Sequence, residues 1–326
     1  MRIAILGAGA WGSALAVSFS AAHAVTLWSR RSDDCAGLAA TRRSRYLPDV
    51  PIPDSVAVEA HLAPAIEGCD LVIVATATSG LRETALAVAA IAPAPALVWA
   101  CKGFEAQTGL LPHQIVAEAL PRARSVAALS GPSFALEVAR GQPTAVVLAA
   151  QDSAFAARIA AALNSARLRI YSNADLIGVE LGGALKNVIA IAAGISDGLA
   201  LGRNARAALV TRGLAEISRL GAAMGGQPET FNGLAGLGDL VLTCTGELSR
   251  NREVGVRLAQ GKSLEAALAE LGHVAEGVHS ARAAWAHARA CKVEMPITEA
   301  VCAVLFDGRP AQDAVRQLLM RDPRQE

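Results

Sequence analysis

The chain has 326 residues, of which 53% are hydrophobic and 18% charged, so it is long enough for about two domains and too apolar for a disordered protein. Its 30 lysines and arginines nearly balance 29 aspartates and glutamates, which disfavours nucleic acid as a partner. The six cysteines include no Cys-x-x-Cys pair, and no His-Glu-x-x-His motif occurs. The sequence therefore predicts reduced thiols and no bound metal.

The N-terminal segment predicts a strand, a helix and a second strand. Residues 2–6 form an apolar run typical of a buried strand, residues 10–22 carry no charge and predict a helix, and residues 25–28 predict another strand. An uncharged run behind Arg2 also occurs in signal peptides, but glycines at the first turn and the strand that follows favour a parallel βαβ unit. We therefore expect no membrane insertion and a cytoplasmic location.

The turn between the first strand and the helix has the pattern G-x-G-x-x-G. Gly7 suits a tight turn, Gly9 lets the backbone approach a pyrophosphate, and Gly12 allows the helix to pack on the strand. The N–H groups and dipole at the start of the helix favour an anion there. The pattern predicts dinucleotide binding, with a purely structural glycine turn as the alternative.

The rest of the first half alternates between strands and helices. Apolar runs at 71–75, 97–100, 126–129, 145–149 and 167–171 predict strands, and stretches at 81–92 and 111–120 predict helices. From Asn173 onward the periodicity is helical almost throughout. The predicted class is α/β: a Rossmann-like doubly wound parallel sheet over residues 1–178, followed by an all-helical C-terminal domain over residues 179–326. We expect the active site in a cleft between the two domains.

The residues after the second predicted strand distinguish NADP from NAD. An acidic residue there would bind the ribose 2′-hydroxyl of NAD, whereas arginine accommodates the 2′-phosphate of NADP. The sequence continues with Arg30 and Arg31, and Asp33 and Asp34 are expected inside the next helix. NADP is therefore favoured without excluding NAD. The alternative is that both arginines are only solvated.

Two further segments follow predicted strands and are expected at the carboxyl edge of the sheet, where open α/β folds bind ligands. Lys102 follows the strand at 97–100 and suits an anionic substrate. Gly131 follows the strand at 126–129 and would let backbone N–H groups approach that substrate. A surface lysine and an ordinary Gly-Pro turn are the alternatives.

The segment Leu-Gly-Gly-Ala-Leu-Lys-Asn at 181–187 is the strongest signal in the second half. On a helix, Gly182 lies one turn before Lys186 and Gly183 one turn before Asn187, so the face beside this polar pair is bare. Two glycines cost a helix roughly 1 kcal/mol each, which favours close approach of a substrate or of a packed helix. Apolar neighbours favour a lowered pKa of Lys186, suited to proton transfer.

Two polar segments follow in the second half. Asp239 comes after a glycine-rich loop expected at 232–238, and Ser249 is a candidate N-cap for a helix that continues with Arg250 and Asn251. A helix N-terminus that carries an arginine suits a phosphate, because N–H groups, the dipole and the guanidinium act on one anion. Simple capping beside a solvated arginine is the alternative.

Taken together, these motifs resemble the bacterial NAD(P)-dependent glycerol-3-phosphate dehydrogenase family over nearly the whole chain. The matching segments are GAGAWG from Gly7, YLPDVPIPD from Tyr46, CKGFE from Cys101, LSGPSFALE from Leu129, GGALKNVIAIAAGISDG from Gly182, LAGLGDLVLTCT from Leu234, SRNR from Ser249, VAEG from Val274 and VEMPITE from Val293. The resemblance implies NAD(P)H-dependent reduction of dihydroxyacetone phosphate to sn-glycerol 3-phosphate for glycerophospholipid synthesis.

The resemblance also implies site residues. Lys186 would exchange a proton with the substrate oxygen, with Lys102 and Asp239 beside it as catalytic residues. The implied substrate contacts are Lys102, Gly131, Ser133, Lys186, Asp239, Ser249, Arg250 and Asn251. The implied cofactor contacts, in addition to Gly7, Gly9, Gly12 and Arg31, are Ala10, Trp11, Arg30, Lys102, Ala135, Arg250, Val274 and Glu276. Position 10 is often serine in the family and is alanine here.

Two competing functions stay open. A β-hydroxyacid dehydrogenase also combines a Rossmann domain, a helical domain and a catalytic lysine, but the Ser-Arg-Asn segment at 249–251 favours the first reading. A dinucleotide-sensing module could use the same fold, although Lys186 together with Asp239 favours an enzyme. A monomer and a homodimer are both compatible with the sequence.

Overall fold

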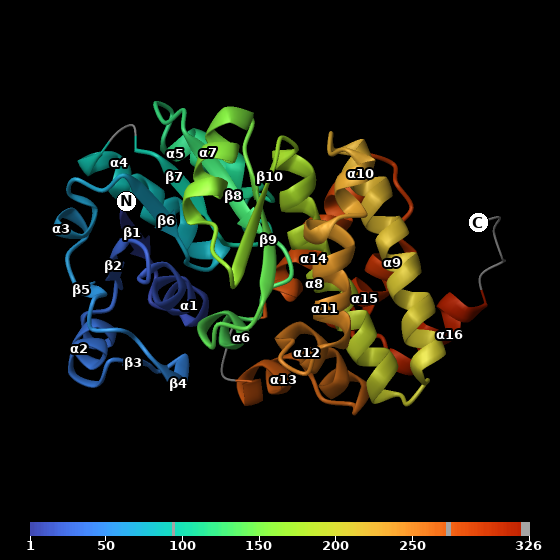
Figure 1. Cartoon of the computed structure of the whole chain (residues 1–326). Coiled ribbons are helices and arrows are strands. Elements are labelled where there is room, and N and C mark those ends of the chain that lie inside the picture. The colour runs from blue at the N-terminus through green and yellow to red at the C-terminus, as the bar shows by residue number, and fades with distance from the viewer. Residues whose placement is uncertain (93–94, 272–274, 321–326) are drawn as a thin grey trace. The chain divides into compact units, whose positions relative to one another are not determined.

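The computed structural model describes residues 1–92, 95–271 and 275–320, and the chain forms two compact units. The sheet unit comprises Met1–Glu105 and Leu110–Leu176, and the helical unit comprises Ala106–Gly109 and Ile177–Glu326. In Figure 1 the strands of the sheet unit run from blue to green, and the helices of the helical unit run from yellow to red.

The sheet unit is built on one eight-stranded sheet in the order β10-β9-β8-β7-β6-β1-β2-β5. The strands are β1 (Arg2–Leu6), β2 (Ala24–Trp28), β5 (Ala57–Glu59), β6 (Leu71–Val74), β7 (Leu97–Trp99), β8 (Val126–Ser130), β9 (Thr144–Ala149) and β10 (Leu168–Asn173). Ile3, Ile5, Leu27 and Ile73 are almost fully buried. The strands read as continuous apolar runs because a parallel sheet of this kind is covered on both faces.

The prediction of a doubly wound sheet is confirmed, but its parallel arrangement is wrong at one pair, because β9 runs antiparallel to β8. The connection between these strands contains only the one-turn helix α6 (Ala135–Ala139). A helix of this length does not carry the chain back along the sheet, so the next strand returns in the opposite direction.

Helices and a small hairpin surround this sheet (Figure 1). The helices are α1 (Ala10–Phe19), α2 (Ser32–Thr41), α3 (Leu62–Ile66), α4 (Leu81–Ile91), α5 (Pro112–Ala119) and α7 (Ser153–Leu163), with a 3-10 turn at Thr78–Gly80. The α1 helix ends before residue 22, since the N–H groups of Ala22 and His23 both turn back to Phe19 O. The antiparallel hairpin β3 (Arg43–Ser44) and β4 (Leu47–Pro51) was not predicted.

Every element described in the helical unit is a helix, as predicted. These are α8 (Leu176–Gly198), α9 (Arg203–Ala223), α10 (Pro228–Phe231), the π-helical turn η2 (Leu234–Gly238), α11 (Asp239–Thr245), α12 (Arg250–Ala259), α13 (Leu264–Leu271), α14 (Glu276–Ala290), α15 (Pro296–Phe306) and α16 (Ala311–Leu319). The loop expected at 232–238 is therefore wrong, because η2 continues directly into α11.

The long helix α8 forms the centre of this unit. It is long and apolar enough to cross a membrane, but 94% of its most apolar window is buried within the protein, as in the core helix of a globular domain. A Cβ on Gly194 would overlap the carbonyl oxygen of Arg252, and a Cβ on Gly255 would overlap that of Ile191. The backbones of α8 and α12 are therefore in direct contact.

Candidate active site

The glycine-rich turn has the geometry that a dinucleotide site requires. Gly7 has φ +124°, and a Cβ there would lie 2.8 Å from the carbonyl atoms of Ala75. A Cβ on Gly12 would overlap Gly7 O, so this glycine packs α1 on the turn. A Cβ on Gly9 would meet nothing within 4 Å. Two of the glycines are thus required by the fold, while Gly9 borders open space at the start of α1, where a pyrophosphate fits.

Arg30 and Arg31 follow β2, and each has a carboxylate partner. Arg30 Nη1 is ion-paired with Glu83 of α4, and Arg31 Nε lies 3.8 Å from Asp34 Oδ2. Both arginines are exposed, and Asp33 and Asp34 lie in the first turn of α2, as the sequence predicted.

Lys102, Gly131 and Ser133 lie together at the carboxyl edge of β7 and β8. The carbonyl oxygen of Gly131 accepts hydrogen bonds from Lys102 Nζ at 2.9 Å and from Ser133 Oγ at 3.0 Å. Gly131 has φ +127°, and a Cβ there would lie 3.1 Å from Val146 Cα, so the turn itself requires a glycine. Ala135 is the first residue of α6.

Lys186 on α8 and Asp239 at the start of α11 form a buried ion pair, with Nζ and Oδ1 2.5 Å apart. The lysine is 8% exposed and the aspartate 1%. Each charge offsets part of the cost of burying the other, because both are withdrawn from water. Thr243 Oγ1 donates to Asp239 O at 2.6 Å and supports this end of the helix.

Gly182 explains how this pair forms. A Cβ at Gly182 would overlap the carbonyl oxygen of Ala235, so this glycine admits the backbone of η2 rather than a ligand. The expected approach of a substrate to the backbone at Gly182 is therefore wrong, and the packing alternative applies there. The close approach of η2 brings Asp239 to Lys186, one helical turn further along α8.

Asn187 and Asn251 belong to a buried chain of hydrogen bonds that sequence reasoning missed. Asn251 Nδ2 donates to Asn187 Oδ1 at 3.0 Å, and Asn251 Oδ1 accepts from Gly277 N at 3.0 Å. A Cβ on Gly277 would lie 2.7 Å from Asn187 O and from Asn251 Oδ1. The side chain of Asn251 thus ties the start of α12 to α8 and α14. The sequence had singled out Asn187 and Asn251 separately, but it gave no signal for the hydrogen bonds that join them.

The start of α12 carries the predicted cap. Ser249 Oγ accepts a hydrogen bond from Arg252 N at 3.3 Å, and Arg250 is the exposed first residue of the helix. Arg252 Nε donates to Asp197 Oδ2 at 2.7 Å, and Arg206 Nη1 lies 3.1 Å from the same oxygen. Asp197 therefore forms ion pairs with two arginines and connects the first turn of α12 to the end of α8.

The other predicted cofactor contacts lie at the starts of two helices or outside the described residues. Ala10 and Trp11 open α1 and are partly buried, and Glu276 is the first residue of α14. Val274 lies outside the described residues. Burial raises the pKa of the Cys244 thiol, close to the Lys186 pair, to about 12, so this thiol is protonated at neutral pH and is no nucleophile.

Known proteins resemble this chain over its whole length. The family model for the N-terminus of NAD-dependent glycerol-3-phosphate dehydrogenase matches residues 2–156, and that for the C-terminus matches residues 175–316. The chain is 58% identical to glycerol-3-phosphate dehydrogenase [NAD(P)+] of Aromatoleum aromaticum and 55% identical to that of Thiobacillus denitrificans, with both chains fully covered. The crystal structure of glycerol-3-phosphate dehydrogenase from Coxiella burnetii superposes with a TM-score of 0.94 at 42% identity, covering 98% of this chain and 99% of that one.

Proposed function

The chain belongs to the NAD-dependent glycerol-3-phosphate dehydrogenase family, an oxidoreductase family, and we propose that it reduces dihydroxyacetone phosphate to sn-glycerol 3-phosphate with NAD(P)H. The product would supply glycerophospholipid synthesis. The observation that carries the proposal is the buried pair of Lys186 and Asp239 in a helical unit whose α12 is capped by Ser249 and begins at Arg250. A proton donor and an anion-binding helix start are the two features that reduction of a phosphorylated ketone requires.

We assign dinucleotide binding to the domain at residues 1–178 and substrate binding to the domain at residues 179–326. The open space at Gly9 fits a pyrophosphate. When bound, the nicotinamide supplies the hydride that reduces the ketone carbon. The residues proposed to contact the dinucleotide are Gly7, Gly9, Ala10, Trp11, Gly12, Arg30, Arg31, Lys102, Ala135, Arg250, Val274 and Glu276.

Lys186 is the proposed general acid. Its ammonium group would donate a proton to the substrate oxygen as negative charge develops there, and it would accept that proton in the reverse reaction. Asp239 holds the ammonium in one position through the 2.5 Å contact and offsets the cost of burying its charge. Lys102 is the third proposed catalytic residue.

The phosphate of the substrate is proposed to bind at the start of α12, where Arg250 offers a forked guanidinium beside the helix N-terminus. Ser249 and Asn251 complete this segment, and Lys102, Gly131 and Ser133 are the proposed substrate contacts from the sheet unit. Binding energy from a phosphate remote from the reacting carbon can fix the ketone for reaction.

The test measures oxidation of NADPH and of NADH by the purified protein with two substrates. One is dihydroxyacetone phosphate, and the other is a β-keto acid, the substrate that a β-hydroxyacid dehydrogenase would reduce. We expect turnover with dihydroxyacetone phosphate and none with the keto acid. Turnover with the keto acid and none with dihydroxyacetone phosphate would overturn the proposal in favour of the β-hydroxyacid dehydrogenase alternative. Dinucleotide binding without turnover of either substrate would favour a sensing module.

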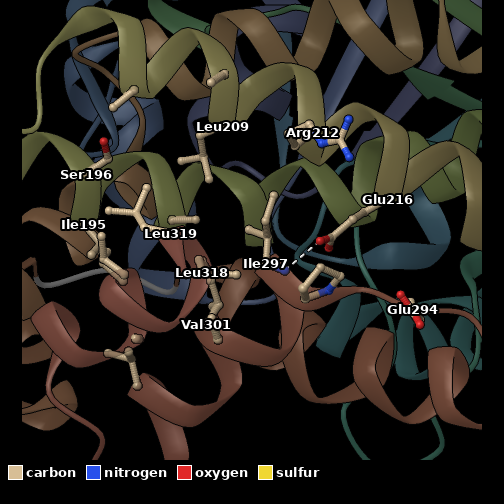
Figure 2. Close-up of a pocket in the computed structure, with 18 of the residues that line it drawn as sticks. Ile195, Ser196, Leu209, Arg212, Glu216, Glu294, Ile297, Val301, Leu318 and Leu319 are labelled. Atoms are coloured by element: carbon tan, nitrogen blue, oxygen red, sulfur yellow. Dashed lines mark hydrogen bonds between the residues drawn. The ribbon is translucent and has the colours of Figure 1, made fainter. Parts of the chain in front are cut away.

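We also propose that the protein is a cytoplasmic homodimer. The helical unit has an apolar groove of about 990 Å³ lined by residues of α8, α9, α15 and α16 (Figure 2). Leu201 and Leu319 in its lining are 41% and 77% exposed, so the groove presents apolar side chains to solvent. Arg212 and Glu294 lie in the same lining, so the groove presents both charges to a second copy.

A twofold axis through this groove would make the same patch of both copies face each other, with apolar side chains and both charges on each side. Size-exclusion chromatography with light scattering should give twice the mass of one chain. Leu319→Glu should shift that mass toward one chain, while Leu86→Glu, at an exposed leucine of the sheet unit, should not. A wild-type mass of one chain would refute the dimer.

A further inference from the structure

We propose that Arg45 is a specificity-determining residue that binds the 2′-phosphate of NADPH together with Arg31, and that Asp34 holds both arginines in position. The inference rests on the proposed use of a phosphorylated dinucleotide, and it names a residue that the glycine-rich motif and the Arg30-Arg31 pair do not include.

The first observation is that two arginines far apart in the sequence share one carboxylate. Asp34 Oδ1 lies 3.4 Å from Arg45 Nε, and Asp34 Oδ2 lies 3.8 Å from Arg31 Nε. The Asp34 side chain is only 12% exposed, whereas those of Arg45 and Arg31 are 51% and 59% exposed. A largely buried anchor thus presents two guanidinium groups to solvent beside the end of β2.

The second observation is that the hairpin carrying Arg45 is fixed to the glycine-rich turn. Ser44 Oγ donates to Ala8 O at 3.2 Å, and both residues are buried. Leu47, just beyond Arg45, packs in a small core with Ala14 of α1. Arg45 is therefore tied to the turn proposed for the pyrophosphate on one side and to α2 on the other.

The Arg45 side chain is also preordered. Its guanidinium lies 4.6 Å from the centroid of the Tyr46 ring, and Nη2 donates a hydrogen bond to the Tyr46 hydroxyl. An arginine held by an aromatic ring and a carboxylate loses less conformational freedom when it binds an anion.

The charge balance among Arg31, Arg45 and Asp34 favours a phosphate over a hydroxyl. Arg30 is already paired with Glu83, while Arg31 and Arg45 share the single charge of Asp34. One positive charge is thus left over between the latter two arginines. A 2′-phosphate carries roughly −1.5 to −2 charges at neutral pH and can accept from both guanidinium groups. The 2′-hydroxyl of NADH is neutral and gains little from them.

The alternative is that Arg45 only takes part in a surface ion pair. Exposed ion pairs contribute little to folding, so in that case its loss would leave the binding of both dinucleotides unchanged. The two interpretations therefore predict different ratios of NADPH to NADH affinity.

The experiment measures the Kd of NADPH and of NADH for the full-length protein and its Arg45→Gln variant by titration calorimetry. We expect the Kd for NADPH to rise roughly tenfold or more, as for loss of a hydrogen bond to a charged group, and that for NADH to change less than about twofold. The matched control is Arg43→Gln, because Arg43 lies in the same hairpin, is exposed, and donates to Pro48 O. This control should leave both Kd values unchanged.

A double-mutant cycle with Arg31→Gln identifies a shared ligand. If both arginines bind one phosphate, the losses of NADPH affinity in the two single variants should be non-additive in the double variant. The affinity for NADH should not fall in any of the three. Equal losses for both dinucleotides, or no loss in R45Q, would overturn the inference. If R45Q kept the wild-type preference for NADPH and R31Q lost it, Arg31 would bind the 2′-phosphate without Arg45, and the role proposed for Arg45 would be refuted. Equal wild-type affinity for both dinucleotides would refute the proposed preference itself, and this inference with it.

Discussion

Lys186 and Asp239 lie 53 residues apart in the sequence, yet their charged atoms meet at 2.5 Å inside the helical unit. The pair exists because Gly182 has no side chain, so that η2 can pack against the backbone of α8. The glycine that lowers the intrinsic stability of α8 is therefore also the residue that allows Asp239 to reach Lys186.

Lys186→Met should lower kcat by roughly 10² or more, the scale of lost general acid catalysis. It should also lower the melting temperature, because the buried charge of Asp239 loses its ion pair with Lys186, a loss of about 3–5 kcal/mol. Adding Asp239→Asn removes that charge and should recover much of the stability but none of the turnover. Turnover near that of the wild type in either variant would contradict the proposed role of Lys186.

Gly9→Ala should change dinucleotide affinity without changing stability, whereas Gly12→Ala should change stability. A Cβ on Gly9 meets no protein atom, so the melting temperature without ligand should stay unchanged while dinucleotide affinity falls, since the methyl group occupies space proposed for the pyrophosphate. A Cβ on Gly12 overlaps backbone at Gly7 O, so this variant should be strongly destabilised with or without ligand. Unchanged dinucleotide affinity in Gly9→Ala would exclude the proposed site.

Arg250→Lys keeps the positive charge at the start of α12 but loses the bidentate geometry of the guanidinium. We expect KM for dihydroxyacetone phosphate to rise and kcat to fall as the ketone loses alignment. The penalty in kcat/KM should be much smaller with dihydroxyacetone, which has no phosphate to hold. An equal penalty for the two ketones would mean that Arg250 does not bind the phosphate.

We expect Glu216 to make the stability of the protein depend on pH. Burial, the largest effect, raises the pKa of its carboxyl from 4.5 to about 7, although Ile297 N and the backbone and hydroxyl of Thr298 donate to it. Because the folded protein binds this proton more tightly than the unfolded chain, the free energy of unfolding should fall as the pH rises from about 4.5 to about 7, and the loss should be complete above that.

The size of this effect is up to a few kcal/mol, about 1.4 kcal/mol for each pKa unit. Urea unfolding at several pH values measures it. Glu216→Gln cannot ionise and should give a flatter curve between about pH 4.5 and 7. The same slope in both proteins would assign the pH dependence to other groups.

The elements that the sequence predicted well are those in which local pattern and global packing agree. The apolar run of β1, the glycine-rich turn and the uncharged helix α1 each follow from neighbouring residues, and so does the cap at Ser249. The direction of β9 depends on the length of the preceding helix, which the apolar pattern does not reveal. The hairpin that carries Arg45 is short and contains prolines, so it shows no clear alternation.

The site was predictable in part for the same reason. Lys102 and Gly131 were expected at one edge of the sheet, and the structure joins them by a hydrogen bond. The function of Gly182 could not be read from its own helix, since its reason is a carbonyl group contributed by Ala235. The second hydrogen-bonding partner of Asn251, Gly277 N, likewise depends on tertiary contact alone.

The backbone contact between α8 and α12 has a mechanical consequence. Gly194 and Gly255 each contact a carbonyl group of the other helix, so no side chain separates the two backbones at these points. Neither helix can slide or roll there by repacking rotamers. The proposed proton donor on α8 and the proposed phosphate anchor on α12 are therefore held at a fixed separation, which sets the length of a ligand that could span them.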